Sequence, residues 1–371
     1  MRVRVPATLR GVIERNGDYE PDIVRAVEEL AVALETNERL PLLAESAPAS
    51  DAVRRACAER AGETWLGTDW FFAETYAYRQ LIERVRFWQT ARDPFLHNKV
   101  EEYASEQHAA AFETALAGRG ARDERFLELL LGGVFGNRID LSFAASLAHG
   151  LTVAEEDLLV DERAAAVRCF FDRSGPLHII ADNAGTELTL DLVLADFVIT
   201  ELGVPVVVHL KAHPTFVSDA TVADVLRFLE LTGEKARKVR SPATSRCLER
   251  LVGAVMSESL TTRAHPFWTS PASLWELPAE LAAELATARL VVLKGDANYR
   301  RAVGDAVWPA DASFADVTPY FPAPLLALRT LKSDPIVGLA PGRAAALDRE
   351  DANWRVNGKR GVASLGGVTR A

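Results

Sequence analysis

The chain has few of the features that define several common protein classes. It holds only three cysteines, Cys57, Cys169 and Cys247, which lie far apart and form no CxxC pair. They indicate buried thiols in a reducing compartment rather than a disulfide framework. No stretch approaches the roughly 18 apolar residues of a membrane span. The basic N-terminus lacks the apolar segment of a signal peptide. We therefore expect a soluble cytoplasmic protein without a membrane partner.

Basic charge is also in deficit, and short catalytic motifs are missing. The chain has 42 Lys and Arg against 52 Asp and Glu, a net charge of −10. A nucleic-acid-binding surface needs a basic footprint, so we expect no nucleic-acid partner. An anionic substrate would need a local basic pocket. The sequence has no Walker A motif, no GxGxxG and no GxSxG.

The first half of the chain has helical patterns. A length of 371 residues suits two structural units or one large α/β domain. Pro21 opens a segment with Ile23, Val27, Leu30 and Leu34 at helical spacing. Further helices are predicted at 65–88, 100–117, 123–131, 138–149 and 152–172. Because no alternation here is long enough for a strand, residues 1–174 are predicted to form a helical N-terminal domain.

After residue 174 short apolar runs alternate with helical segments. Strands are predicted at 177–181, 205–210 and 289–294, and helices at 187–202 and 220–231. This alternation is typical of βαβ units in a mostly parallel sheet, which predicts an α/β domain over residues 175–371. A longer helical insertion is expected before the third strand. The segment WRVNGKRGV, residues 354–362, is predicted to be a hairpin or an edge strand.

Polar residues follow each of the three predicted strands. Asp182 and Asn183 come directly after LHIIA, Asp219 ends VVVHLKAHPTFVSD, and Asp296 follows RLVVLKG. Since neighbouring parallel strands end at one crevice, these residues could converge on one divalent metal ion. Carboxylate and amide oxygens suit Mg²⁺ or Mn²⁺. The alternative for each is a plain turn or helix cap, and it stays open.

Two further segments carry polar groups that could meet an anion. The stretch GDANYRR, residues 295–301, is expected to be a strand-exit loop whose Asp296, Asn298 and Arg300 point toward a ligand. Arg329 and Lys332 in RTLK would share one face if that segment were helical. A phosphate could bridge such cations to an acidic metal site. Surface salt bridges are the alternative.

Two glutamates and two histidines complete the set of candidates. Glu187 begins the helix after Asn183, where it could face the crevice or merely interact with the helix dipole. Glu74 is the odd polar residue in an aromatic helix. His209 and His213 have HxxxH spacing, but His209 lies in a predicted strand, so a zinc pair is not expected.

Four motifs together resemble a known family. The segments DNAGTELTLDLVLADF, KAHPTFVSDAT, LKGDANYRRAVGD and RTLK occur in this order. They resemble the damage-control phosphatase family, formerly domain of unknown function eighty-nine. The Arg-Thr-x-Lys signature indicates its acidic-residue methyltransferase-like subgroup. TWLGTDWFFAETYAYRQL and WRVNGKRGV also look like that family, so the resemblance spans nearly the whole chain. The chain departs at Thr186, where an aromatic is expected, and at Ala297, where Leu is expected.

The resemblance implies a fold, an activity and a set of site residues. The fold would be a three-layer α/β/α sandwich with a helical part before it. The activity would be metal-dependent hydrolysis of phosphate monoesters of small metabolites such as sugar phosphates, with Mn, Mg, Co or Ni. The implied metal ligands are Asp182, Asn183 and Asp219. The implied catalytic residues are Asp182, Asn183, Asp219, Asp296 and Lys332, and the implied substrate-binding residues are Glu74, Glu187, Asp296, Asn298, Arg300 and Lys332.

Two other functions remain open from the sequence. One is an S-adenosylmethionine-dependent protein carboxyl methyltransferase, an activity proposed within this subgroup, to whose methyl-donor site Glu187 would correspond. The glycine-rich loop common in Rossmann-type methyltransferases is missing here. The other is a non-catalytic metabolite-binding protein. Against it, acidic, amide and basic groups gathered at strand ends are costly to bury unless they are paired. The substrate, the metal, the choice between direct water attack and a covalent intermediate, and the oligomeric state also stay open.

Overall fold

The chain forms two compact units. The computed structural model describes residues 1–43, 51–136, 157–230 and 241–367, with side chains from residue 53 in the second range. The helical unit comprises Met1–Glu101, Lys211–Thr221 and Ala264–Ala272. The sheet unit comprises Glu102–Leu210, Val222–Arg263 and Ser273–Ala371. The division differs from the predicted boundary after residue 174, because helices that follow Glu102 pack in the sheet unit.

The helical unit is built from short amphipathic helices. Their bounds are α1 Arg4–Arg15, α2 Pro21–Thr36, α3 Asp51–Glu59, α4 Trp70–Arg84, α5 Phe87–Thr90, most of α6 Leu96–Tyr103, and the 3₁₀ helix η1 Pro266–Thr269. Pro21 stands in the first turn of α2, where its missing N–H is not needed. The predicted apolar face of α2 is buried, with Ile23 and Val27 in the core of this unit. The helix predicted from Pro21 is therefore confirmed.

One mixed sheet forms the centre of the sheet unit. In the described part of the chain its seven strands have the order β1-β7-β6-β5-β2-β3-β4. Their bounds are β1 Leu158–Asp161, β2 Leu177–Ile180, β3 Val206–Lys211, β4 Leu260–His265, β5 Leu290–Lys294, β6 Pro324–Thr330 and β7 Gly361–Gly367. β2 pairs in parallel with β3 and β5, β5 with β6, and β1 with β7, whereas β6 and β7 are antiparallel. The predicted α/β class with a mostly parallel sheet is confirmed.

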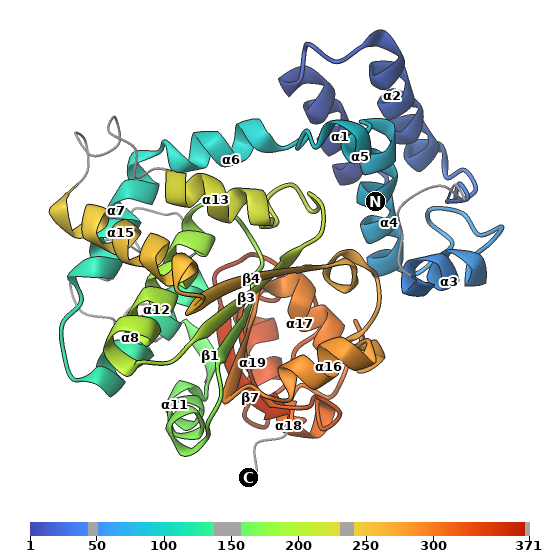
Figure 1. Cartoon of the computed structure of the whole chain (residues 1–371). Coiled ribbons are helices and arrows are strands. Elements are labelled where there is room, and N and C mark those ends of the chain that lie inside the picture. The colour runs from blue at the N-terminus through green and yellow to red at the C-terminus, as the bar shows by residue number, and fades with distance from the viewer. Residues whose placement is uncertain (44–50, 137–156, 231–240, 368–371) are drawn as a thin grey trace. The chain divides into compact units, whose positions relative to one another are not determined.

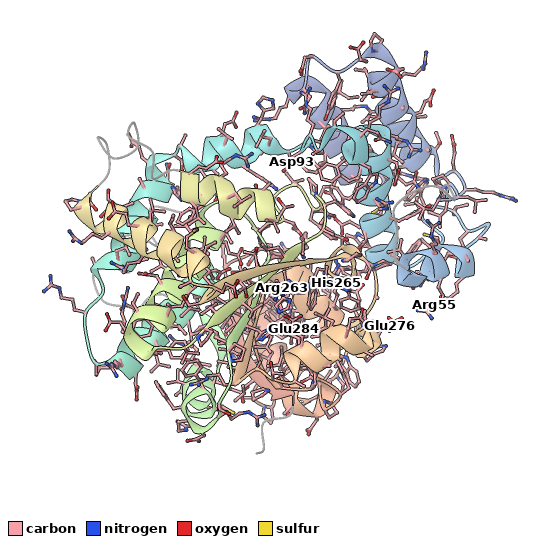
Figure 2. The ribbon with its side chains drawn as sticks, viewed as in Figure 1. Arg55, Asp93, Arg263, His265, Glu276 and Glu284 are labelled. Carbon is pink, nitrogen blue, oxygen red and sulfur yellow. The ribbon has the colours of Figure 1, made fainter. Side chains whose placement is uncertain are left out.

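Helices cover both sides of this sheet, as Figure 1 shows, with α7, α8, α12 and α15 on one side and α16, α17 and α19 on the other. Their bounds are α7 Glu106–Ala117, α8 Arg122–Phe135, α11 Arg163–Asp172, α12 Thr186–Leu202, α13 Val222–Glu230, α15 Pro242–Met256, η2 Leu274–Glu276, α16 Ala279–Leu285, α17 Asp296–Val303, α18 Phe314–Val317 and α19 Arg343–Glu350. At its edge, Arg263 of β4 and Glu284 of α16 form an ion pair of 3.4 Å (Figure 2).

Helix α12 is the central helix of the sheet unit. It contacts α7, α8 and α15, and its residues from Thr186 to Asp196 are all buried. A helix that is apolar nearly all round must be enclosed on all sides. It ends at Gly203, which has a left-handed conformation, and a backbone N–H at this cap donates to the carbonyl of Val198. Because α12 begins directly after the turn that carries Asp182 and Asn183, its packing fixes that turn.

Several predicted elements were wrong. The stretch 152–172 contains strand β1 before helix α11, because the four residues LLVD are too short to show alternation. The insertion before β5 contains strand β4. GDANYRR is not a loop but opens helix α17. Arg329 lies in strand β6, so the condition under which it would share a helical face with Lys332 is not met. β7 lies between β1 and β6, so it is not an edge strand. The helix predicted at 138–149 lies outside the described residues.

Candidate active site

Asp182, Asn183 and Glu187 form a hydrogen-bonded group where β2 passes into α12. Ile180 pairs with residues of both β3 and β5, so β2 ends in the middle of the sheet. All three polar side chains are buried. The amide Nδ2 of Asn183 donates to Asp182 Oδ2 at 3.1 Å and to Glu187 Oε2 at 2.9 Å. The amide therefore holds two buried carboxylates in fixed positions.

Gly295 lets the next strand end pass directly against Asp182. Its φ is +83°, and a Cβ at this position would lie 1.9 Å from Asp182 Oδ2. Its N–H donates to the carbonyl of Leu328 at 2.9 Å, which ties the end of β5 to β6. Only glycine fits here, because it combines a positive φ with the missing side chain. The turn from β5 into α17 is thus shaped around the carboxylate of Asp182.

A small cavity joins four of the predicted site residues. Asp182, Glu187, Asp296 and Lys332 all line it. Its other walls are Val134, Gly295, Leu328 and Thr330. Its volume is about 10 Å³, which is close to the space needed by a single water molecule. It is therefore the size of an ion or a water, and lies where the ends of β2, β5 and β6 meet.

Two neighbouring side chains fit a divalent cation in their chemistry. The carboxylate of Asp182, which lines the cavity, and the amide oxygen of Asn183, the next residue in the chain, are hard oxygen donors, which Mg²⁺ and Mn²⁺ prefer. In the described part of the chain, no group of three or more His, Cys, Asp or Glu side chains is arranged to hold a metal ion. The predicted ligand set contains only two such side chains, Asp182 and Asp219, together with an amide.

A buried lysine balances the acidic groups behind the cavity. Lys294, fully buried, places Nζ 2.8 Å from Asp191 Oδ1 and 3.3 Å from Glu187 Oε1, and donates to the carbonyl of Gly133 at 2.7 Å. Burial raises the pKa of Asp191 to about 6, although Lys294 opposes the shift. Burial would lower the pKa of Lys294, but Asp191 and Glu187 raise it overall. The group holds Glu187 in place.

Sequence reasoning missed both Lys294 and Asp191. The available signals were a lysine inside the apolar strand LVVLK and an aspartate four residues after Glu187 in an apolar helix. Charged residues are rarely buried unless they are paired, so each implied a partner. The partner itself became visible only in the folded chain.

Arg329 and Lys332 of the RTLK motif have different surroundings. Arg329 is fully buried and donates from Nε to Asp296 Oδ1 at 2.7 Å, while its guanidinium lies over the ring of Tyr299. Ser333 Oγ also donates to Asp296 Oδ1, at 2.9 Å. Lys332 follows the strand with an exposed side chain that lines the cavity. Arg329 therefore positions Asp296, and Lys332 is the cation in reach of a ligand.

Asn298 and Arg300 do not line this cavity. Asn298 Nδ2 donates to the carbonyl of Lys294 at 2.8 Å and to that of Ala181 at 3.3 Å, which links the ends of β5 and β2. Arg300 makes a two-point ion pair with Asp305, with distances of 2.5 and 2.9 Å. In this structure both side chains therefore bind other parts of the protein. The ligand contacts that the resemblance implies for them stay predictions.

Asp219 and Glu74 belong to the helical unit. Asp219 Oδ2 lies 3.0 Å from Lys211 Nζ, and both side chains are almost completely buried. The residues Phe216 and Val217, shortly before it, have φ of 46° and 73°, which is rare for such side chains and costs energy. Glu74 is buried in α4 and ion-paired with Arg4. Their predicted roles stay predictions.

Glu102 is a further residue that the sequence did not reveal. Its Oε1 accepts the N–H of Thr186 at 2.8 Å, in the first turn of α12. A Cβ on Gly185, whose φ is +70°, would lie 2.2 Å from the Glu102 carboxyl carbon. Burial raises the pKa of Glu102, against the lowering effect of the Thr186 hydrogen bonds. Glu102 thus caps α12 from a distant part of the chain.

Polar groups gathered at the carboxyl ends of central parallel strands define the class of α/β enzymes that bind ligands there. The family model "Damage-control phosphatase ARMT1-like domain" matches residues 1–347, and the chain belongs to this family. The resemblance noted in the sequence is confirmed. Membership of this family identifies the chain as an enzyme of the phosphatase class and supports a house-cleaning function. No helix among the described residues is long and apolar enough to cross a membrane.

Named relatives agree with this assignment, and a solved structure supports the fold. The damage-control phosphatase ARMT1 of Danio rerio is 31% identical over 333 residues, covering 81% of this chain and 73% of that protein. The protein of the same name from Rattus norvegicus is 31% identical over 335 residues, covering 82% and 75%. The crystal structure of a DUF89 family protein from Pyrococcus horikoshii matches with a TM-score of 0.51 at 14% identity, covering 98% of both chains, and supports the fold.

Proposed function

We propose that this protein is a metal-dependent phosphatase that hydrolyses phosphate monoesters of small metabolites, with sugar phosphates as the substrate class. The observation that carries the proposal is the ion-sized cavity lined by Asp182, Glu187, Asp296 and Lys332. It combines oxygen donors for a cation with an exposed lysine for an anion. The three cysteines of the chain form no disulfide, which supports the proposed reducing, cytoplasmic location.

Asp182 and Asn183 would hold the divalent ion, which could be Mn, Mg, Co or Ni. When bound, such an ion polarises a phosphoryl oxygen and lowers the pKa of a water molecule. The Asn183 amide keeps the Asp182 carboxylate in place by its hydrogen bond. Asp219 is proposed as the third ligand from the sequence alone, and within its own unit it is paired with Lys211.

Lys332 and Asp296 would act on the substrate and the attacking water. The ammonium of Lys332 would neutralise charge on the transferring phosphoryl group. Asp296 would orient or deprotonate a water, for which geometry matters first. The hydrogen bonds that it receives from Arg329, Ser333 and the Lys332 N–H all go to Oδ1. Its Oδ2 is the oxygen that would face the water. Glu187, engaged by Asn183 and Lys294, would support this site.

The test is a phosphatase assay with p-nitrophenyl phosphate across a metal series, followed by a panel of sugar phosphates. We expect activity that a chelator removes, and a fall in kcat of about a hundredfold or more in Asp182→Asn and Lys332→Ala. Asp172→Asn, at an exposed position of α11, is the matched control and should keep full activity. Unchanged activity in Asp182→Asn, or activity unaffected by chelator, would contradict the proposal.

The same preparation separates the two rival functions. Titration calorimetry with S-adenosylmethionine tests the methyltransferase, because an enzyme that uses this donor must bind it. No binding at millimolar ligand would remove that function. Binding of sugar phosphates without turnover under any metal would instead favour a non-catalytic binding protein.

A further inference from the structure

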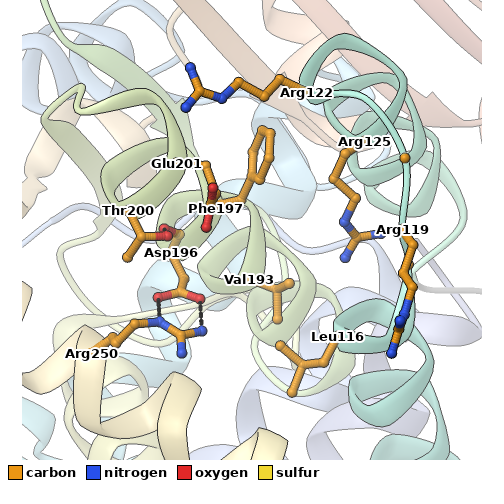
Figure 3. Close-up of a pocket in the computed structure, with 12 residues that line it drawn as sticks. Leu116, Arg119, Arg122, Arg125, Val193, Asp196, Phe197, Thr200, Glu201 and Arg250 are labelled. Atoms are coloured by element: carbon orange, nitrogen blue, oxygen red, sulfur yellow. Dashed lines mark hydrogen bonds and ion pairs between the residues drawn. The ribbon is translucent and has the colours of Figure 1, made fainter.

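A second and larger cavity lies in the sheet unit, away from the candidate active site. Its volume is about 370 Å³, within the range of small-molecule sites. Figure 3 shows its walls, with the connection from α7 to α8 on one side and α12 and α15 on the other. It is lined by Leu116, Gly118, Arg119, Gly120, Arg122, Arg125, Val193, Asp196, Phe197, Thr200, Glu201 and Arg250. It shares no lining residue with the first cavity.

Four arginines and only two acids face this cavity, in a chain whose net charge is −10. Arg250 on α15 is neutralised by Asp196, with two hydrogen bonds of 2.8 and 2.5 Å. Arg125 is held by Glu128 at 2.5 Å and by the carbonyl of Ala115. These two guanidiniums are thus fixed on opposite sides of the space, as Figure 3 shows.

Arg119 and Arg122 differ from that pair. Neither side chain has an ion pair or hydrogen bond to another residue in the described ranges of the chain. Arg122 is the first residue of α8, where the helix dipole disfavours a cation and favours an anion. Within this end of α8, Glu124 is used as a local cap, since its carboxylate accepts the N–H of Ala121 at 3.1 Å. The positive charges of Arg119 and Arg122 are left for an external anion.

The backbone beside these arginines is tightly placed. A Cβ on Gly118 would lie 1.8 Å from Arg125 Nη1, so the chain turns directly against this fixed guanidinium. Arg119 follows at once and lines the cavity. Leu116, Val193 and the half-buried ring of Phe197 supply apolar surface beside the charges. A ligand that fits both would carry an anionic group on an apolar body.

We propose that this cavity is a second ligand site, which binds a small phosphorylated organic molecule without acting on it. Guanidinium groups match phosphate oxygens by two-point hydrogen bonding, which favours phosphate over a simple anion. The site is distinct from the candidate active site: Glu187 and Asp196 lie nine residues apart on α12, roughly 14 Å along the helix axis. The two sites share this rigid helix.

Calorimetry with pyrophosphate, in the presence of a chelator, tests the binding step directly. The chelator removes metal-dependent binding at the candidate active site. We expect saturable binding to the parent protein that weakens about tenfold in Arg119→Ala or Arg122→Ala, and further in the double variant. Because neither side chain has a partner in the described structure, both variants should fold normally, which circular dichroism checks. Higher salt should weaken the binding.

Two comparisons make the result specific. The double variant Arg168→Ala and Arg349→Ala removes two other exposed arginines of the same unit and should bind as the parent does. Lys332→Ala should also bind as the parent does, since Lys332 belongs to the first cavity. The proposal is overturned if the parent shows no saturable binding at millimolar pyrophosphate. It is equally overturned if Arg119→Ala and Arg122→Ala together leave binding unchanged, if Lys332→Ala abolishes it, or if the control loses it.

Discussion

Replacing Lys294 by methionine should destabilise the sheet unit strongly, although the new side chain is apolar and of similar length. Lys294 is fully buried and its ammonium compensates two carboxylates, Asp191 and Glu187. It also donates to the carbonyl of Gly133. The variant would leave the carboxylates without their cation and the carbonyl without its donor.

The magnitude follows from the burial of this group. Removing one partner of a buried ion pair costs about 3–5 kcal/mol, because the remaining charge is left uncompensated. Burial already raises the pKa of Asp191 to about 6 although Lys294 is present, so the charged carboxylate depends on this lysine. The double variant Lys294→Met with Asp191→Leu removes both charges of the closest pair, and should recover a large part of the loss.

Urea denaturation followed by circular dichroism measures these differences. Since the chain has two compact units, the transition of the sheet unit must be resolved from that of the helical unit before a free energy is derived. We expect the single variant to be about 3–5 kcal/mol less stable than the parent, and the double variant to lie between them. A single variant within about 1 kcal/mol of the parent would refute the reasoning, since that change is typical of ordinary substitutions.

Three further predictions concern single residues of the sheet unit. Gly295→Ala should lower the free energy of unfolding by about 1–3 kcal/mol and reduce phosphatase activity, because its Cβ would meet Asp182; an active, equally stable variant would contradict this. Burial lowers the pKa of His178 to about 4, so this residue should not reduce the free energy of unfolding above pH 6.5. Between pH 6.5 and pH 4 the unfolded chain binds the proton more readily, so the free energy of unfolding should fall by up to about 3 kcal/mol. His178→Phe should reduce this loss in pH-dependent denaturation. Glu102→Ala should cost about 1 kcal/mol in thermal denaturation through the lost Thr186 contact, and Glu102→Gln clearly less; equal losses would argue against the cap.

The central strands and helices were predictable because they are short apolar runs separated by clear turn signals. LHII, VVVHLK and LVVLK became β2, β3 and β5, and the apolar stretch after Gly185 became α12. The strands β1 and β4 were not predictable in the same way. β1 has four residues, and β4, with the sequence LTTRAH, is largely exposed or half-buried, so neither shows a buried run.

The site was predictable in part, and the remainder depends on tertiary pairing. Asp182, Asp296 and Lys332 were proposed from strand ends and from the family motifs, and in the structure all three line one cavity. Arg329 would share a face with Lys332 only if RTLK were helical, but it lies in a strand that buries it against Asp296. The pairing of Lys294 was invisible because its partners lie about a hundred residues away in the chain.

Binding of Mn²⁺, followed by calorimetry or electron paramagnetic resonance, tests most directly whether Asp182 holds a metal ion. We predict one Mn²⁺ per chain in the parent, an affinity lowered about a hundredfold in Asp182→Asn, and no change in Asp172→Asn. Equal affinity in the parent and in Asp182→Asn would contradict the account, because the ion would then be held by other groups.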